Sequence, residues 1–306
     1  MVKDKEIEFL LQLLDDPDPA VHRHVSDKLI SLGAAVVPNL EDAHHHAIMT
    51  NNDLLEKHVE YVMGKIDFNA LLIRITDWLE SPNRDLLNGI MLIAAYSQPD
   101  VKITQQEERI DRIRRDIYFQ LSMRYSPLKI VSIINQVFYD IYEYKTAKVL
   151  MDFHFFANYM LSFRKGSPVL MNIIYLLVAR KLNLAIYPVN VSSNFLLAYI
   201  KKRQTPTFDD MSLEEFLVKK IELFIDPSNK GAIYRPREIR TFLEERGIGL
   251  QAEKFAFCTD LDMLNYLIND LCEIYKQSGK LEKVNELKQI YTMISAKILQ
   301  ISDKLA

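Results

Sequence analysis

The chain has little glycine, little cysteine and no dominant charge. Its eight glycines among 306 residues suit a mainly helical protein, because glycine weakens helix interiors and serves mainly turns and caps. A net charge of −3 supplies no field that would attract nucleic acid. No glycine-rich phosphate loop occurs, so nucleotide binding has no support. We therefore expect neither nucleic acid nor a nucleotide cofactor as a ligand.

Long apolar runs are also missing. The longest, at 168–179 and 89–96, fall short of the roughly 20 residues that span a bilayer. The first residues carry acidic side chains and lack the apolar core of a secretory signal. Two cysteines, Cys258 and Cys272, suit a reducing compartment better than a disulfide framework. These features predict a cytoplasmic protein without a membrane partner.

The first hundred residues predict short amphipathic helices separated by breakers. The prolines of 15–19 cannot continue a helix, and Val21, Val25, Leu29 and Leu32 then recur at helical spacing. A helix, a break and a second helix resemble one HEAT-type repeat, which buries its apolar stripe only by stacking on a neighbour. No fixed period is sustained. We predict a HEAT-like helical region over residues 1–100.

Two charged or aromatic clusters could suggest nucleic acid, but a structural role is favoured for both. Four arginines at 109–115 lie among acidic residues, as on a salt-bridged helix surface. The aromatic cluster at 153–163 has no alternating basic residues, which favours core packing over base stacking.

The histidines invite a metal hypothesis that the spacing does not favour. Consecutive residues of a helix point about 100° apart, so His44, His45 and His46 cannot converge on one ion. His22 could still meet His44 or His45 across a helix hairpin. The sequence predicts no metal site and no cofactor.

The segment from Arg164 to Asp226 predicts a helix beside strands. Ser167 is a natural N-cap and Pro168 a natural first helical residue, and the following residues to Leu182 are densely apolar, as in a buried helix. Strand-like runs follow at 185–191, 194–201 and 221–225, and the last ends in Asp226. A helix N-terminus that faces strands bearing a base and a carboxylate is the arrangement that thiol acyl transfer needs.

This segment resembles the SirB-type transglutaminase-like family of bacterial proteins. The residues that carry the resemblance are Arg164, Gly166, Pro168, Ala179-Arg180-Lys181-Leu182, Ser192-Ser193-Asn194-Phe195-Leu196 and Ile225-Asp226-Pro227-Ser228-Asn229. More weakly, the similarity extends upstream to about Asp15 and downstream to a tail whose two helices look like the family's tetratricopeptide-like ending.

The resemblance implies an active site from which the reactive groups have been lost. Leu170 stands where active relatives have the nucleophile, and Asn194 stands where the family has histidine. Of the Cys, His, Asp set only the carboxylate of Asp226 remains. Asparagine cannot accept a proton from a nucleophile near neutral pH. We expect no catalytic residue here, with Ser167, Ser193 and Asn229 as polar residues lining the old cleft.

Other residues could in principle replace the lost groups. Ser167 and Ser193 carry hydroxyls, but serines at caps and turns usually bind backbone. His154 is more typical of a packing histidine than of a displaced base, and Cys258 has no base assigned to it.

The sequence therefore predicts a predominantly helical α+β protein. A papain/transglutaminase-like core with a small antiparallel sheet is expected at 101–248, followed by a C-terminal, tetratricopeptide-like helical hairpin at 249–306. The favoured function is that of a pseudoenzyme that binds a protein or peptide. The alternative is an amide-bond hydrolase or acyltransferase with a rearranged active site, and a scaffold for oligomer assembly is a third possibility. The oligomeric state and the identity of the partner are not fixed by the sequence.

Overall fold

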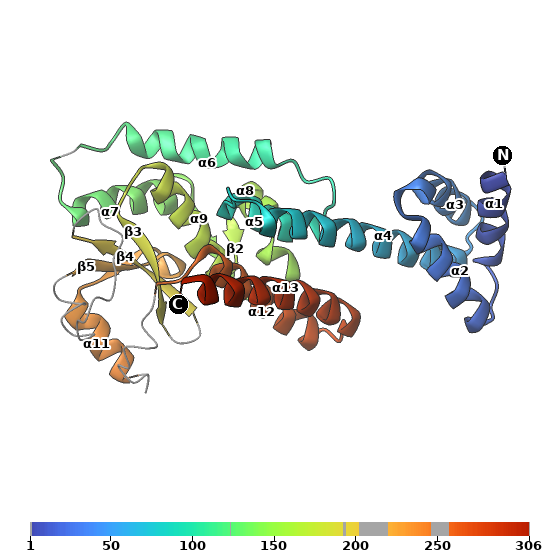
Figure 1. The fold of residues 1–306 in the computed structure, drawn as a ribbon. Helices are drawn as coiled ribbons and strands as arrows, with labels where there is room; N and C mark the ends of the chain where they lie inside the picture. The colour runs from blue at the N-terminus through green and yellow to red at the C-terminus, as the bar shows by residue number, and fades with distance from the viewer. Residues whose placement is uncertain (1, 123, 192–193, 202–219, 246–256, 306) are drawn as a thin grey trace. The chain divides into compact units, whose positions relative to one another are not determined.

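The computed structural model describes residues 2–122, 124–191, 194–201, 220–245 and 257–305 (Figure 1). The chain divides into two compact units, and the boundary lies between Arg74 and Ile75. In the described part, no helix is both long and apolar enough to cross a membrane.

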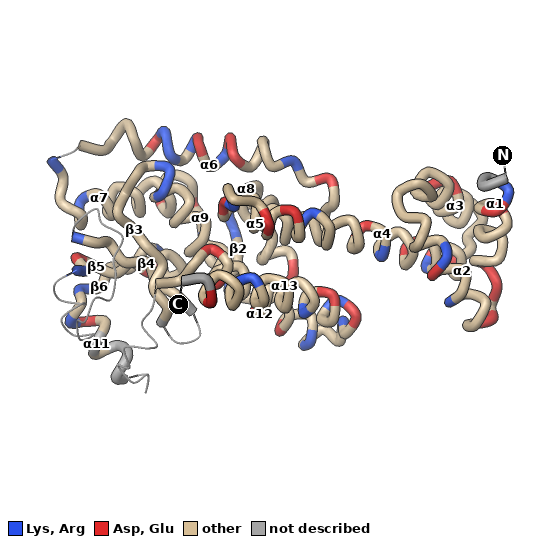
Figure 2. The backbone as a smooth tube through the Cα atoms, viewed as in Figure 1, with Lys and Arg blue, Asp and Glu red and all other residues tan. Residues whose placement is uncertain are grey.

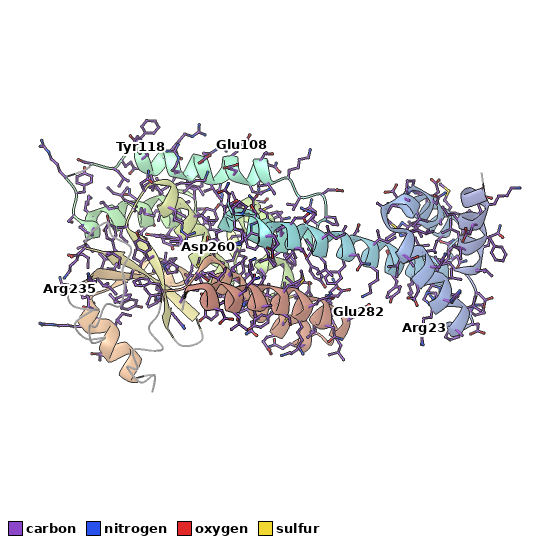
Figure 3. The ribbon with its side chains drawn as sticks, viewed as in Figure 1. Arg23, Glu108, Tyr118, Arg235, Asp260 and Glu282 are labelled. Atoms are coloured by element: carbon purple, nitrogen blue, oxygen red, sulfur yellow. The ribbon has the colours of Figure 1, made fainter. Side chains whose placement is uncertain are left out.

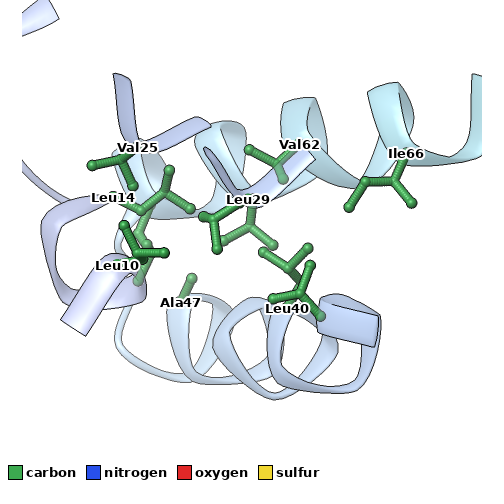
Figure 4. Packing of buried hydrophobic residues seen from close by; sticks show 11 residues of the cluster. Leu10, Leu14, Val25, Leu29, Leu40, Ala47, Val62 and Ile66 are labelled. Atoms are coloured by element: carbon green, nitrogen blue, oxygen red, sulfur yellow. The ribbon is translucent and has the colours of Figure 1, made fainter. Parts of the chain in front are cut away.

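The first unit is a small all-helical bundle. It is built from α1 (Val2–Leu13), α2 (Pro19–Leu32), the short 3-10 helix η1 (Gly33–Val36), α3 (Val37–Met49) and the first part of α4 (Asp53–Glu80). Asp18, which lies between the two prolines of the predicted breaker, caps α2 by accepting the N–H of Ala20 at 2.8 Å. The buried apolar side chains of these helices interdigitate to form one core (Figure 4).

Most of the second unit is helical. Its described helices are the end of α4, α5 (Leu86–Ala95), α6 (Ile103–Tyr118), α7 (Pro127–Asn135), the π-helix η2 (Gln136–Ile141), η3 (Asp152–Phe155), α8 (Ala157–Phe163), α9 (Pro168–Lys181), η4 (Pro227–Asn229), α11 (Pro236–Glu245), α12 (Asp260–Gln277) and α13 (Leu281–Leu305). Along α6, arginines alternate with acidic residues (Figure 2), and Lys181 of α9 forms ion pairs with Glu107 and Asp111. This helix therefore has a mixed, ion-paired surface.

A four-stranded antiparallel sheet completes the second unit. Its strands β3 (Ile186–Val191), β4 (Asn194–Ile200), β5 (Ile221–Asp226) and β6 (Ala232–Tyr234) pair in sequence order. A separate parallel pair joins β1 (Lys145–Thr146) to β2 (Lys165–Gly166). Leu223, Phe224 and Ile225 are all buried, so both faces of β5 are covered. The predicted class, predominantly helical α+β with a small antiparallel sheet, is confirmed.

Helix α9 is the central element of the second unit. Its residues from Val169 to Ala179 are all buried, and it packs against α6, α12, β3, β4 and η4. At its C-terminal end, Arg180 forms a bidentate ion pair with Asp260 at 3.0 and 2.7 Å (Asp260 is labelled in Figure 3). This ion pair between Arg180 and Asp260 joins α9 to the first turn of α12. The helices α12 and α13 pack against each other as a hairpin at the C-terminal end of the chain.

Candidate functional site

The N-terminus of α9 is capped by a buried serine. The Oγ of Ser167 accepts the N–H of Leu170 at 3.3 Å, and its carbonyl accepts the N–H of Met171 at 3.0 Å. The N–H of Ser167 in turn donates to the carbonyl of His154 at 2.8 Å. The predicted N-cap and first helical residue are confirmed, and the Ser167 hydroxyl is engaged by the helix it caps.

Leu170 is completely buried in the first turn of α9. Its side chain has no ionisable or nucleophilic atom, and full burial gives it the role of a core residue. The positive end of the helix dipole therefore faces hydrocarbon at the position where a thiolate would benefit from it.

Asn172 joins the segments that carry the three sequence-predicted site residues. Its Nδ2 donates to the carbonyl of Phe195 at 2.8 Å, and its Oδ1 accepts the N–H of Ser228 at 3.1 Å. Phe195 directly follows Asn194, and Ser228 lies two residues after Asp226. One buried amide on α9 thus holds β4 and the turn after β5 within hydrogen-bond reach of the same helical turn.

The turn after Asp226 is held by further hydrogen bonds. Ser228 donates its hydroxyl to Oδ1 of Asp226 at 2.5 Å, and Tyr139 donates to the carbonyl of Pro227 at 2.8 Å. Thr146 donates to the carbonyl of Ser228 at 2.7 Å. Burial, with a smaller contribution from Asp226, raises the pKa of Tyr139 far above its usual range, so this phenol stays a neutral donor. Among the described residues, the hydrogen-bond donor to the Asp226 side chain is a hydroxyl rather than an imidazole.

Asn194, to which the sequence resemblance assigns the family's histidine position, lies at the start of β4. The backbone of Asn194 pairs with Val191 of β3, but its side chain lies outside what the structure describes, as does the whole of Ser193. Asn229 is exposed at the end of η4, where it lines a pocket.

His154 is not paired with a nucleophile in the described part of the chain. Its Nδ1 accepts the N–H of Met151 at 3.0 Å, so the proton of the neutral ring lies on Nε2. That Nε2 is buried and has no hydrogen-bond partner. Burial, and next the nearby Lys165 ammonium, lower the pKa of His154. The Ser167 hydroxyl, which caps α9, therefore has no hydrogen bond to this imidazole.

The two cysteines are protonated thiols. Burial and the carboxylate of Asp262 raise the pKa of Cys258 to about 12, and burial raises the pKa of Cys272. Neither thiol offers the thiolate that nucleophilic attack requires.

An open pocket of about 770 Å³ lies beside the turn after Asp226. Its lining includes four lysines and no acidic residue among the described side chains: Lys145, Lys148, Lys165 and Lys230. None of the four forms an ion pair with a described residue. The pocket therefore concentrates positive charge.

Tyr144 adds a buried phenol to this pocket. Its side chain is only 4% exposed, and its hydroxyl makes no hydrogen bond to any described residue. Burial raises its pKa to about 12, although Arg164 and Arg109 oppose the shift, so the phenol keeps its proton. A protonated hydroxyl and four ammonium groups form a donor set suited to anions.

Sequence reasoning missed both Asn172 and the lysine-lined pocket. The sequence did contain a signal for Asn172, because an amide inside an otherwise apolar helix must find buried hydrogen-bond partners. It contained no signal for the pocket, since the lining residues come from 139–149, 165 and 227–230 and meet only in the folded chain.

Comparison with known proteins places these residues inside one matched region. A family model described as the transglutaminase-like superfamily matches residues 104–269, just over half of the chain. The chain is also similar to F-box only protein 21 of Mus musculus, with 29% identity over 129 residues. That match covers 38% of this chain and 20% of the mouse protein, so the chain spans about one fifth of the relative's length. No solved structure matches the chain.

Proposed function

Since this chain belongs to the transglutaminase-like superfamily, we propose that it is a non-catalytic member that binds a protein or peptide beside its degenerate active site. The observation that carries the first half of the proposal is the complete burial of Leu170 at the start of α9. A catalyst of acyl transfer needs a nucleophile and a base within hydrogen-bond reach of one another. Among the described residues around α9, no thiol or hydroxyl is paired with an imidazole base: the Ser167 hydroxyl caps the helix, and the Ser228 hydroxyl donates to the Asp226 carboxylate.

The motif string from Arg164 to Asn229 supports a finer assignment to the SirB-type group. The bacterial origin that this resemblance implies stays a prediction, as do the HEAT-like and tetratricopeptide-like character of the flanking helices. The F-box relative in mouse is similar over part of the chain only, and it carries no assignment of a partner.

The binding half of the proposal rests on the lysine-lined pocket. It is lined by Pro227, Ser228 and Asn229 of η4, directly after Asp226, the carboxylate to which the resemblance assigns a place in the active site. Four unpaired lysines and the Tyr144 hydroxyl favour an anionic ligand. A volume of about 770 Å³ accommodates several side chains of an extended segment. We assign the partner to the class of peptides that carry glutamate or aspartate side chains.

An activity assay tests the first half. Purified protein is incubated with a glutamine-containing peptide and a primary amine, and both hydrolysis and transamidation are followed by mass spectrometry. We expect no product above the buffer control, with wild type and Asp226→Ala indistinguishable. Product that forms with wild type and disappears in a folded Asp226→Ala protein would favour the alternative, an acyltransferase or hydrolase with a rearranged site.

A binding titration tests the second half. Fluorescence anisotropy compares a labelled glutamate-rich peptide with its glutamine counterpart, using wild type, Lys145→Gln/Lys165→Gln and the control Lys129→Gln/Lys288→Gln, which changes two exposed lysines outside the pocket. We expect the acidic peptide to bind preferentially, and the pocket variant to weaken it at least about 10-fold, with attenuation by salt. An equal loss of affinity in the pocket variant and the control variant would show that the peptide binds through general surface charge, and it would overturn the assignment.

A further inference from the structure

The first unit contains a cluster of one histidine and two glutamates that could bind a metal ion. These residues are more than 100 positions before Arg164, where the candidate site begins in the sequence. His44 of α3 and Glu56 and Glu60 of α4 place one ligand atom each within 4.8 Å of the other two. The two glutamates are one helical turn apart, so their side chains share a face of α4. The ring of His44 meets them from the neighbouring helix, with its Nε2 at 3.5 Å from Oε1 of Glu60.

The core of this unit fixes the two helices that supply the ligands. Leu40 and Ala47 of α3 are fully buried on either side of His44, and Val59 of α4 is fully buried between the two glutamates (Figure 4 shows the surrounding core). These apolar contacts set the helix spacing and hold His44 opposite the acidic face of α4. The position of the imidazole is therefore built into the packing.

The Nε2 atom of His44 lacks a hydrogen-bond partner among the described residues. This nitrogen is buried, and two carboxylates lie near it. A buried polar atom without a partner costs about 1–3 kcal/mol, and a metal ion is one of the partners that removes this cost.

The glutamates are also electrostatically uncompensated. Within the described residues Glu56 forms no ion pair, and the ion-pair contact of Glu60 is with His44, which is charged only when protonated. Like charges at i and i+4 on a helix repel one another. A divalent cation between them would turn this repulsion into attraction and would satisfy the imidazole nitrogen as well.

We propose that His44, Glu56 and Glu60 form a binding site for a divalent transition-metal ion, with Zn²⁺ as the preferred ion. One imidazole and two carboxylates match the ligand types of zinc sites, and three protein ligands leave a position for water. Two tetrahedral zinc ligands lie about 3.4 Å apart, close to the spacing already present between His44 and Glu60. The imidazole disfavours Mg²⁺ and Ca²⁺, which select oxygen ligands.

The other histidines of this unit do not join the set. The ring of His22 contacts that of His58 in a tilted arrangement with centroids 3.6 Å apart, and its Nε2 lies 3.2 Å from the hydroxyl of Ser26. His58 donates from Nδ1 to the carbonyl of Leu14 at 2.8 Å. The sequence left open a contact of His22 with His44 or His45, but in the structure His22 contacts His58. His45 is exposed and next to His44, so it serves as a matched control.

The test is metal titration of the full, tag-free chain. Calorimetry with Zn²⁺, and visible absorption with Co²⁺ as a spectroscopic substitute, compare wild type with His44→Gln, Glu60→Gln and the control His45→Gln. We expect one tight site in wild type and in the control, and at least about 10-fold weaker binding in each ligand variant. The Co²⁺ absorption of His44→Gln should lose its ligand-field bands, and Mg²⁺ should not compete.

Three results would overturn the proposal: no saturable Zn²⁺ binding by wild type, unchanged affinity in both ligand variants, or an equal loss in His45→Gln. Thermal melts of the metal-free proteins accompany the titration. Because His44 and Glu60 are partly exposed, both variants should fold, and Glu60→Gln provides an independent test if one of them does not.

Discussion

The side-chain oxygen of Asn172 accepts the backbone N–H of Ser228 at 3.1 Å, and this bond fixes the turn after Asp226 to the N-terminal part of α9. The same side chain donates to the carbonyl of Phe195 in β4. The side-chain amide of Asn172 therefore fixes the positions of the helix, the strand and the turn relative to one another. Asn172 is 1% exposed, so each bond is shielded from water.

Replacing Asn172 by leucine should strongly destabilise the second unit. The change removes the hydrogen bonds that Asn172 makes to the carbonyl of Phe195 and to the N–H of Ser228, at a cost of about 2–4 kcal/mol for the two bonds together. Urea unfolding followed by circular dichroism measures the loss. Asn229→Ala, on the exposed end of the same turn, should change stability by less than about 0.5 kcal/mol. Equal stability of wild type and Asn172→Leu would show that the bridge is dispensable.

Gly231 is expected to tolerate no side chain. It has φ of +68°, and a Cβ built there would lie 2.1 Å from the Asn135 side chain, which itself donates to the Gly231 carbonyl at 2.7 Å. Gly279 is the matched control, because its φ is +72° and a Cβ there would meet nothing within 4 Å.

We expect Gly279→Ala to cost about 1 kcal/mol from backbone strain alone. Gly231→Ala should cost at least about 2 kcal/mol more, because the Asn135 side chain must also move. The two free energies of unfolding, measured under identical conditions, give this difference directly. A difference near zero would mean that Asn135 adapts without loss.

Both cysteines should react slowly with alkylating agents in the native protein. The raised pKa of Cys258, about 12, leaves almost no thiolate at neutral pH, and Cys272 is buried. Mass spectrometry after iodoacetamide treatment at pH 7.5 should find at least about 100-fold slower labelling than in the urea-unfolded chain. Rapid native labelling of Cys258 would instead identify an activated thiol and would favour the enzymatic alternative.

His154 should make the protein less stable as the pH falls. Its folded-state pKa is lowered by burial and by Lys165, whereas the unfolded chain binds a proton at the usual value near 6.5. Below that value the unfolded state carries more protons on this residue than the folded state, so protonation favours unfolding. The contribution is absent well above pH 6.5 and grows as the pH drops toward the folded-state pKa.

Proton NMR of the His154 ring checks this directly. The titration midpoint should lie below 6.5 in the native protein and near 6.5 in concentrated urea, which is the internal control. A native midpoint above 6.5 would mean that the ring finds a carboxylate partner, and the stability trend with pH would then reverse.

Local signals in the sequence were sufficient for the elements around the site. Ser167 and Pro168 mark the start of α9 because capping and proline geometry act within one turn, and Asp226 ends a strand whose other residues are apolar except for the exposed Glu222. The parallel pair β1–β2 was not predicted, because two residues per strand carry no periodicity. The partners of Asn172 were equally hidden, since they lie 23 and 56 residues further along the chain.

The sequence by itself determined which reactive groups are present at each position. Leucine at 170 and asparagine at 194 cannot act as nucleophile and base in any conformation, because neither side chain has a group that can attack a carbonyl or accept a proton near neutral pH. What only the tertiary structure decided is which groups share a volume. The meeting of four lysines with Tyr144, and of His44 with two glutamates on the next helix, depends on packing between distant segments, and packing is set by the buried core rather than by the spacing of residues along the chain.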